Sequence, residues 1–305
     1  MAALLAGTPV SLFSPMSEPI PATTEDLREW STVITPEQGW FDLRLREVWA
    51  YRDLIYLFCK RDFVTSYKQT VLGPFWFFAQ PVMTSLVFWV VFGRVGKIVT
   101  KGVPQFLFFM AGIILWQFFS QCLIKTATTL NANAGIFGKV YFPRLTVPLS
   151  VTVTQGLTFL IQFALFLVMF GVAWRFGVPV HPNWRVIMLP LLLVQIAALA
   201  LGVGCVVAAL TTRFRDLAFV IQFGVNLAMY ASCVVFPLEN VPLQYRSWML
   251  LNPMVPIIEG FRYAFIGYGV FEFWHLWLSL GITALICFIG IVMFRHVEKT
   301  AMDTV

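Results

Sequence analysis

The chain has 305 residues, of which 59% are hydrophobic and 12% are charged, and its formal net charge is +6. Soluble domains carry roughly 25% charged residues, so this composition excludes a chain whose whole surface faces water. The positive charge is not the footprint of a nucleic-acid-binding protein, and its distribution among the loops is more informative.

Residues 1–40 predict a flexible N-terminal tail and not a secretory signal. They contain five prolines and several acidic residues, and no basic segment precedes the short apolar run at residues 2–6. We expect little structure of its own in this tail.

Residues 41–68 predict a cytoplasmic amphipathic helix at the membrane interface. One apolar face at helical spacing, interrupted by Arg52, comprises Leu45, Val48, Trp49, Tyr56, Cys59 and Phe63, and a second apolar stripe comprises Leu54, Leu57 and Phe58. Such a helix is expected to lie on the membrane and also to contact protein. Periodicity alone is equally compatible with a helix that simply lies on the surface.

Residues 69–305 predict a domain of six transmembrane helices. Each span is free of acidic and basic residues for long enough to cross a bilayer, which requires roughly 20 residues at a rise of about 1.5 Å. A helix satisfies its own backbone in lipid, so the expected class is an all-α membrane protein. The predicted spans are residues 69–93, 103–124, 147–173, 186–211, 217–237 and 274–294.

The loop charges predict that both termini are cytoplasmic. Six spans put the termini on one side, and that side carries fourteen Lys and Arg residues against seven on the other. The positive-inside rule places the richer side in the cytoplasm, although the first external loop, with three cations, opposes it locally.

Residues 239–272 predict short reentrant helices before the last span. The apolar run 247–258 is too short to cross and contains Pro253 and Pro256, and an aromatic, glycine-rich piece follows at 261–271. An ordinary external loop with an aromatic belt remains the alternative.

The sequence contains no recognisable catalytic or metal-binding motif. Gly96-Lys97 and Gly138-Lys139 are followed by Ile98 and Val140, which cannot supply the Ser or Thr of a P-loop. The five cysteines form no CxxC pair, and the three histidines lie at span edges or in loops. Ion-coupled transporters usually need charged residues at membrane depth, so the empty spans indicate that energy arrives from another chain.

Three blocks of sequence resemble the permease subunit of bacterial polysaccharide-export ABC transporters, which export O-antigen, capsule and teichoic-acid chains. The resemblance covers roughly residues 49–295 and departs at Thr65-Ser66, where the family often has a further cation. The matching residues are Tyr51-Arg52-Asp53-Leu54, Arg61-Asp62, Tyr67 to Pro74, Trp76 and Gln80-Pro81 in the first block, Phe142-Pro143-Arg144-Leu145 and Pro148 in the second, and Asn252-Pro253 and Glu259-Gly260-Phe261-Arg262 in the third.

This resemblance implies a permease in the bacterial cytoplasmic (inner) membrane that moves a lipid-linked glycan. It implies a homodimer with two separate ATP-binding subunits, which bind the ATP and magnesium, so that this chain holds no cofactor and is no enzyme on its own. It also implies that the approach helix and the first cytoplasmic loop transmit the ATPase motion.

The residues expected to carry that motion fall into two sets. Coupling to the ATPase subunit is expected from Asn131, Asn133, Gly135, Phe137, Lys139, Tyr141 and Arg144. The hinge into the first span is expected from Arg52, Arg61, Asp62, Tyr67, Lys68, Gly73 and Pro74. The residues alone favour a plain connector with its cations facing lipid phosphates, and the coupling role comes from the resemblance.

Aromatic side chains are the expected contacts of the glycan, because flat rings support the C–H faces of sugars. The candidates are Trp76, Phe77, Phe88, Trp89, Tyr230, Tyr245, Trp248, Tyr263 and Tyr268. Helix packing or a lipid belt is the competing role for each.

Two other functions remain compatible with the sequence. One is an ABC exporter of the same architecture for a drug or small lipid, and the other is a membrane scaffold that transports nothing.

Overall fold

The computed structural model describes residues 45–68, 73–98, 102–137, 139–140, 142–212, 214 and 216–300, and these residues contain no β-strand. The expected tail, residues 1–40, lies outside them. Five segments are long and apolar enough to cross a membrane: Phe75–Val95, Gln105–Ala127, Thr146–Arg175, Trp184–Thr211 and Phe273–Val297. They coincide with five of the six predicted spans, which confirms an all-helical chain of membrane-spanning type.

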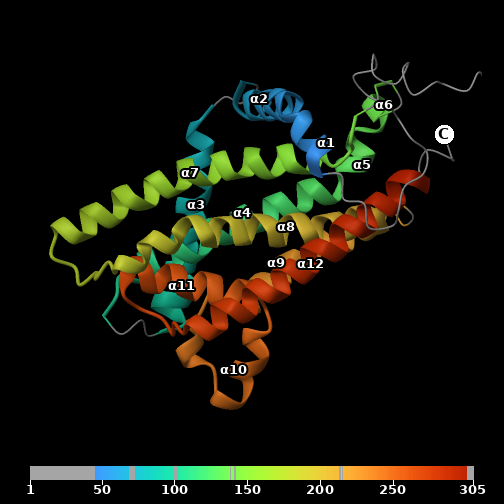
Figure 1. The fold of residues 1–305 in the computed structure, drawn as a ribbon. Helices are drawn as coiled ribbons and strands as arrows, with labels where there is room; N and C mark the ends of the chain where they lie inside the picture. Colours follow the sequence, from blue (N-terminus) through green and yellow to red (C-terminus); the bar gives the residue numbers. More distant parts are fainter. Residues whose placement is uncertain are drawn as a thin grey trace, which may run out of the picture. The chain divides into compact units, whose positions relative to one another are not determined.

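The approach to the first span is a pair of helices, α1 (Leu45–Ala50) and α2 (Arg52–Lys68). The expected apolar face of this segment is divided in two, because Val48 and Cys59 are buried against protein whereas Trp49 and Tyr56 are mostly exposed. Helix α2 crosses over the start of α7 (Figure 1).

The first span begins at a backbone break. Gly73 has a φ of 52°, in the left-handed region that favours glycine, and α3 (Phe75–Phe88) starts directly after Pro74. The span continues without interruption as a π-helix, η2 (Trp89–Val95), in which Gly96 N–H donates to the Val91 carbonyl five residues earlier.

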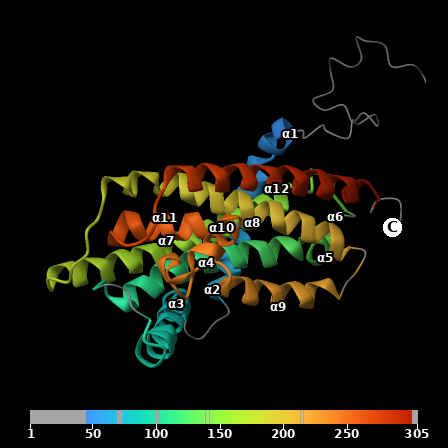
Figure 2. The same ribbon diagram turned by 90° about the horizontal axis from the view of Figure 1, so that it is seen from below.

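Helix α4 (Gln105–Ala127) is the centre of the bundle. Every residue from Leu107 to Trp116 is buried, as expected for a helix that is apolar on all sides. It packs between α7 (Thr146–Arg175) and α8 (Leu189–Thr211), which follows the 3-10 helix η3 (Trp184–Met188). Figure 2 shows these three helices side by side, with α12 (Phe273–Thr300) along the far side of α8.

Glycines allow α8 to approach its neighbours at backbone distance. A β-carbon at Gly202 would lie 2.6 Å from the Cα of Cys287 in α12, and one at Gly290 would overlap the carbonyl oxygen of Gly202. A β-carbon at Gly204 would lie 2.6 Å from the Cβ of Thr126 in α4. Small residues thus bring three spans together by close van der Waals contact, which is how helices associate in lipid.

The fifth predicted span is shorter than expected. Helix α9 (Leu217–Tyr230) has 14 residues, which span only about 21 Å, and the chain then turns without helical structure through residues 231–236. A 3-10 turn, η4 (Leu238–Asn240), and two further helices, α10 (Leu243–Leu250) and α11 (Met254–Ile266), lead to α12.

The first loop between spans on the α2 side contains two single-turn helices, α5 (Thr129–Ala132) and α6 (Ala134–Phe137). They carry the chain from the end of α4 to the start of α7. This loop is the segment expected to couple to an ATPase.

We predict that Gly290→Ala lowers the stability of the fold, because the added methyl group overlaps the backbone of α8. The expected loss is about 1–3 kcal/mol, the usual cost of overpacking. Thermal unfolding of the purified chain in detergent measures it. Gly281→Ala, on the same helix with open space around its β-carbon, is the matched control and should change the midpoint little. Equal midpoints for the two variants would contradict the close crossing.

Candidate functional site

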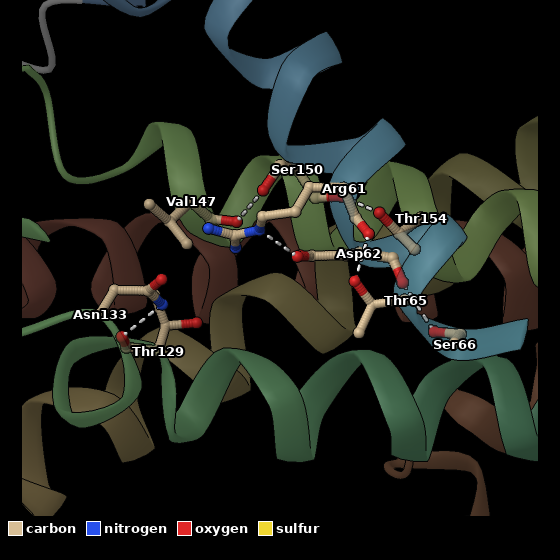
Figure 3. A network of polar contacts seen from close by, with 9 residues as sticks. All are labelled: Arg61, Asp62, Thr65, Ser66, Thr129, Asn133, Val147, Ser150 and Thr154. Carbon is tan, nitrogen blue, oxygen red and sulfur yellow. Dashed lines mark hydrogen bonds and ion pairs between the residues drawn. The ribbon is translucent and has the colours of Figure 1, made fainter. Parts of the chain in front are cut away.

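The second half of α2 carries four polar side chains that make contacts within their own helix. Arg61 Nε donates to Asp62 Oδ1 at 2.8 Å, and the Arg61 guanidinium lies 4.9 Å from the centre of the Phe58 ring. Thr65 Oγ1 donates to the Arg61 carbonyl and Ser66 Oγ to that of Asp62 (Figure 3). These polar side chains lie over the first turns of α7, so the structure places the expected hinge residues Arg61 and Asp62 between α2 and α7.

An aromatic stack connects α2 to the first span across the break. The rings of Phe63 and Phe77 are parallel within 6° and their centres are 6.0 Å apart. The hinge residues Gly73 and Pro74 form the break itself, whereas Arg52 and Lys68 have exposed side chains. The side chain of Tyr67 lies outside the described residues. The stack gives α2 a direct mechanical contact with α3.

The expected coupling residues are only partly brought together. Asn133 Nδ2 donates to the Thr129 carbonyl at 3.0 Å, which closes the turn between α5 and α6. The Arg144 guanidinium lies 5.3 Å from the centre of the Phe137 ring, so these two residues meet. Gly135 and Lys139 are exposed. Tyr141 and the side chain of Asn131 lie outside the described residues.

The loop and α2 share a small apolar cluster that the sequence analysis did not identify as a site. Phe142 is buried with its ring centre 5.8 Å from that of Phe58 and 5.6 Å from that of Phe137. Val147 at the start of α7 completes the cluster. Its signal was Phe142 within the second matching block, directly before Pro143 and Arg144. The approach helix and the loop are therefore attached to each other.

The aromatic residues expected along a glycan path do not form one surface in this chain. Phe88 and Tyr268 are buried in the core, each 7–8% exposed, and Tyr268 packs edge-on against Phe108. Tyr263 stacks on Phe271, and the Arg185 guanidinium lies 4.8 Å from both ring centres.

The remaining candidates divide among three regions. Tyr230, Tyr245 and Trp248 are exposed at the end of α9 and on α10, and Trp89 stacks with Arg94 in the π-helix. Trp76 and Phe77, at the start of α3, line a polar cavity of about 190 Å³. Two of the expected path residues therefore face an internal space together with polar side chains.

Arg262 joins three segments that are far apart in the sequence. It is fully buried in α11, and its guanidinium donates to the carbonyls of Cys233 and Val234, each at 2.7 Å, and of Phe108 at 3.3 Å. The guanidinium also lies 3.6 Å from the centre of the Phe108 ring. Gly112 makes room for it, because a β-carbon there would lie 2.5 Å from Arg262 Nη2.

Glu259, one helical turn earlier, balances the buried charge. Its Oε1 lies 3.5 Å from Arg262 Nη1, and its carboxylate accepts the N–H groups of Leu238 and Val270 at 3.3 Å. Burial raises the pKa of Glu259, which the guanidinium and the two N–H groups oppose. Burial lowers the pKa of Arg262 to about 10, so Arg262 remains charged at neutral pH.

This pair explains why the chain can leave helical structure after Tyr230. Cys233 has a φ of 54°, and the carbonyls that follow the break have no helical partner, so the guanidinium supplies their donors. Asn252 Nδ2 adds a bond of 3.2 Å to the Ala231 carbonyl. The sequence signal for these buried contacts was an acidic and a basic residue at positions i and i+3 inside an otherwise apolar segment. Charged residues in such a segment indicate a functional or structural role.

Comparison with a family model and with known proteins points to one family of transporters in each case. The chain matches the ABC-2 type transporter family over residues 53–266. It is 30% identical to an O-antigen export system permease protein, RfbA, of Myxococcus xanthus over 72% of this chain and 83% of that protein. It is 25% identical to a protein of the same name in Klebsiella pneumoniae, over 81% of this chain and 92% of that one. It is also 25% identical to the polysialic acid transport protein KpsM of Escherichia coli, over 80% and 93% of the two chains.

We predict that Arg262→Gln destabilises the chain more than the loss of an exposed cation does. The variant leaves the carbonyls of Cys233 and Val234 without one or both donors and Glu259 without its counter-charge, at a cost of about 3–5 kcal/mol. Thermal unfolding in detergent and hydrogen exchange of residues 231–238 measure the effect. Arg175→Gln, at the exposed end of α7, is the control. Equal stability of the two variants would show that the contacts of Arg262 are not needed for the stability of the fold.

Proposed function

Because the chain belongs to the ABC-2 type transporter family, we propose that it is the transmembrane permease subunit of an ATP-driven exporter of lipid-linked polysaccharide. The cargo class is an O-antigen-like, capsular or teichoic-acid glycan, and the membrane is the bacterial inner membrane. The observation that carries this proposal is similarity over most of the chain to permeases named for O-antigen and polysialic acid transport.

The proposed topology has six spans with both termini in the cytoplasm. In it, α9 and the buried segment after it together form the fifth crossing, since non-helical backbone is tolerated at membrane depth where protein surrounds it. The charge distribution supports this orientation more strongly once burial is considered. Of the cations counted on the external side, Arg262 is fully buried and Arg185 is stacked between aromatic rings, so neither acts as a free loop charge.

Helices α10 and α11 are proposed to be the reentrant pair on the external side, and α1 and α2 the interfacial approach helix. The exposed aromatics Tyr245 and Trp248 on α10 suit the boundary between lipid and water. Trp49 and Tyr56 on the approach helices suit the opposite boundary in the same way.

The permease is proposed to work as a homodimer with two ATP-binding subunits docked beneath α5 and α6. ATP and magnesium are proposed to bind to those subunits, because the sequence of this chain contains no P-loop. The cluster of Phe58, Phe137 and Phe142 supports this assignment, because it attaches the docking loop to α2. A displacement of the loop would then be transmitted through α2 to α3 by the stack of Phe63 on Phe77.

The names of the relatives favour a polysaccharide over a drug or small lipid as cargo. The same names, and the transporter family itself, favour transport over a scaffold that moves nothing.

We predict that deleting the gene removes the glycan from the cell surface and leaves lipid-linked glycan inside the cell. Surface lectin or antibody staining and extraction of the lipid-linked pool measure the two quantities. Complementation with the intact chain is the control. Intact surface glycan after deletion would contradict the proposed cargo. Robust ATP hydrolysis by this chain alone would contradict the proposal that a separate subunit hydrolyses the ATP.

We predict that Phe142→Ala and Arg144→Ala uncouple ATP hydrolysis from export, because Phe142→Ala loosens the loop from α2 and Arg144→Ala removes the contact with Phe137 within the loop. The complex should hydrolyse ATP at a near-normal rate while glycan export falls severalfold. ATPase assays on the purified complex and surface staining of cells measure the two activities. Phe176→Ala, an exposed ring in the loop after α7, is the control and should leave both unchanged. If ATP hydrolysis and glycan export were both lost or both retained in the loop variants, the proposed coupling role of the loop would be contradicted.

A further inference from the structure

We propose that a glutamine-lined groove between α2, α3, α4 and α7 binds the glycan on the cytoplasmic side, by hydrogen bonds between the hydroxyl groups of the sugars and the side-chain amides. This inference rests on the proposed export function and specifies where and by what chemistry that function holds its cargo.

The groove consists of two adjoining cavities. The inner one has a volume of about 190 Å³ and the outer one about 510 Å³, and both are lined by Ser66, Lys125 and Gln155. On α7 the lining runs from Val151 to Gln162, which is a length of about 16 Å along the helix. The outer volume lies within the range of about 300–1,000 Å³ that is usual for ligand sites.

Four helices contribute to the groove, and each does so with one face. The lining residues of α7 recur at three and four residues, as do those of α4, so each of these helices turns one face of mixed polar and aromatic residues toward the same space, whereas α3 contributes two aromatic rings and Gln80. The lining of the inner cavity is Ser66 from α2, Trp76, Phe77 and Gln80 from α3, Gln117, Phe118, Gln121 and Lys125 from α4, and Gln155, Thr158, Phe159 and Gln162 from α7.

Five of these lining residues are glutamines, inside helices that are mostly apolar. Gln162 Nε2 donates to Gln117 Oε1 at 3.1 Å. The side-chain amides of Gln80, Gln121 and Gln155 make no hydrogen bond within the part of the chain that the structure describes. None of their nitrogen or oxygen atoms is among the fully buried polar atoms without a partner, so these amides are accessible from the groove and can bond to what enters it.

Amides match sugar hydroxyls because both donate and accept hydrogen bonds. The aromatic rings of Trp76, Phe77, Phe118 and Phe159 line the same cavity and offer flat apolar surfaces to the C–H faces of a pyranose. Lys125 is the one charged residue of the inner lining, and Asp62 at the outer cavity is already paired with Arg61. The groove is therefore built to hold a polyhydroxyl chain and not an ion.

The position of the groove connects glycan binding to the proposed transmission of motion from the ATP-binding subunit. Arg61, Asp62, Thr65 and Ser66 of α2 form one wall of the outer cavity. Since α2 is attached to the docking loop through Phe58 and to α3 through Phe63, a movement of the loop reaches the wall that contacts the cargo.

The test uses the complete transporter in cells that synthesise its glycan. In the double variant Gln121→Leu, Gln155→Leu, export should fall about tenfold, as expected for two lost hydrogen bonds, while the complex assembles and hydrolyses ATP. Gln222→Leu is the matched control, because it makes the same change at an exposed position on α9 outside the groove. The variants Gln121→Asn and Gln155→Asn keep an amide and should retain more export than the leucine variants.

A photo-reactive phenylalanine analogue at position 121 provides a second readout that does not depend on folding of the leucine variants. Irradiation should crosslink the lipid-linked glycan to position 121 and not to position 222. Export at the level of the Gln222→Leu control by the double variant, or equal crosslinking at both positions, would overturn the groove assignment. Gene deletion separates this failure from a failure of the proposed function, because only the latter leaves surface glycan intact in the deletion strain.

Discussion

The constraint on which the structure depends is that backbone carbonyls without a helical partner must still be bonded where water is excluded. The chain leaves helical structure after Tyr230, and Arg262 meets that requirement by donating to the carbonyls of Cys233 and Val234. The same guanidinium contacts α4 at Phe108, in the centre of the bundle. One side chain thus fixes the segment after α9 to the core and supplies hydrogen bonds that its irregular backbone lacks.

Two clusters of polar side chains within the bundle differ in chemistry. Glu259 and Arg262 are buried and bonded to each other and to backbone groups, which suits a rigid structural contact. Glutamines and Lys125 instead line an open groove beside α2. In the proposed exporter, the first cluster would hold the segment after α9 in place, and the groove would hold the cargo next to the helix that is proposed to move.

Most of the fold could be predicted from the sequence, because charge-free runs of the required length leave few alternatives to spanning helices. The Gly73-Pro74 break was predicted for a separate reason, because only glycine easily adopts the left-handed backbone conformation that Gly73 has. The shortness of α9 could not be predicted, because residues 231–236 are as apolar as a helix and their conformation depends on Arg262, some 30 residues later. The glutamine groove was missed because its residues come from four helices, and each glutamine alone looks like an isolated polar residue in a span.

Reconstitution in proteoliposomes shows whether this chain and an ATP-binding subunit together move a lipid-linked glycan across a membrane. This chain and its ATP-binding subunit would be placed in proteoliposomes loaded on one leaflet with lipid-linked glycan, and the appearance of glycan on the opposite leaflet would be followed with an impermeant lectin. The account predicts translocation that requires ATP, magnesium and both proteins. Translocation without the ATP-binding subunit, or ATP hydrolysis by the complete complex with no glycan crossing, would contradict it.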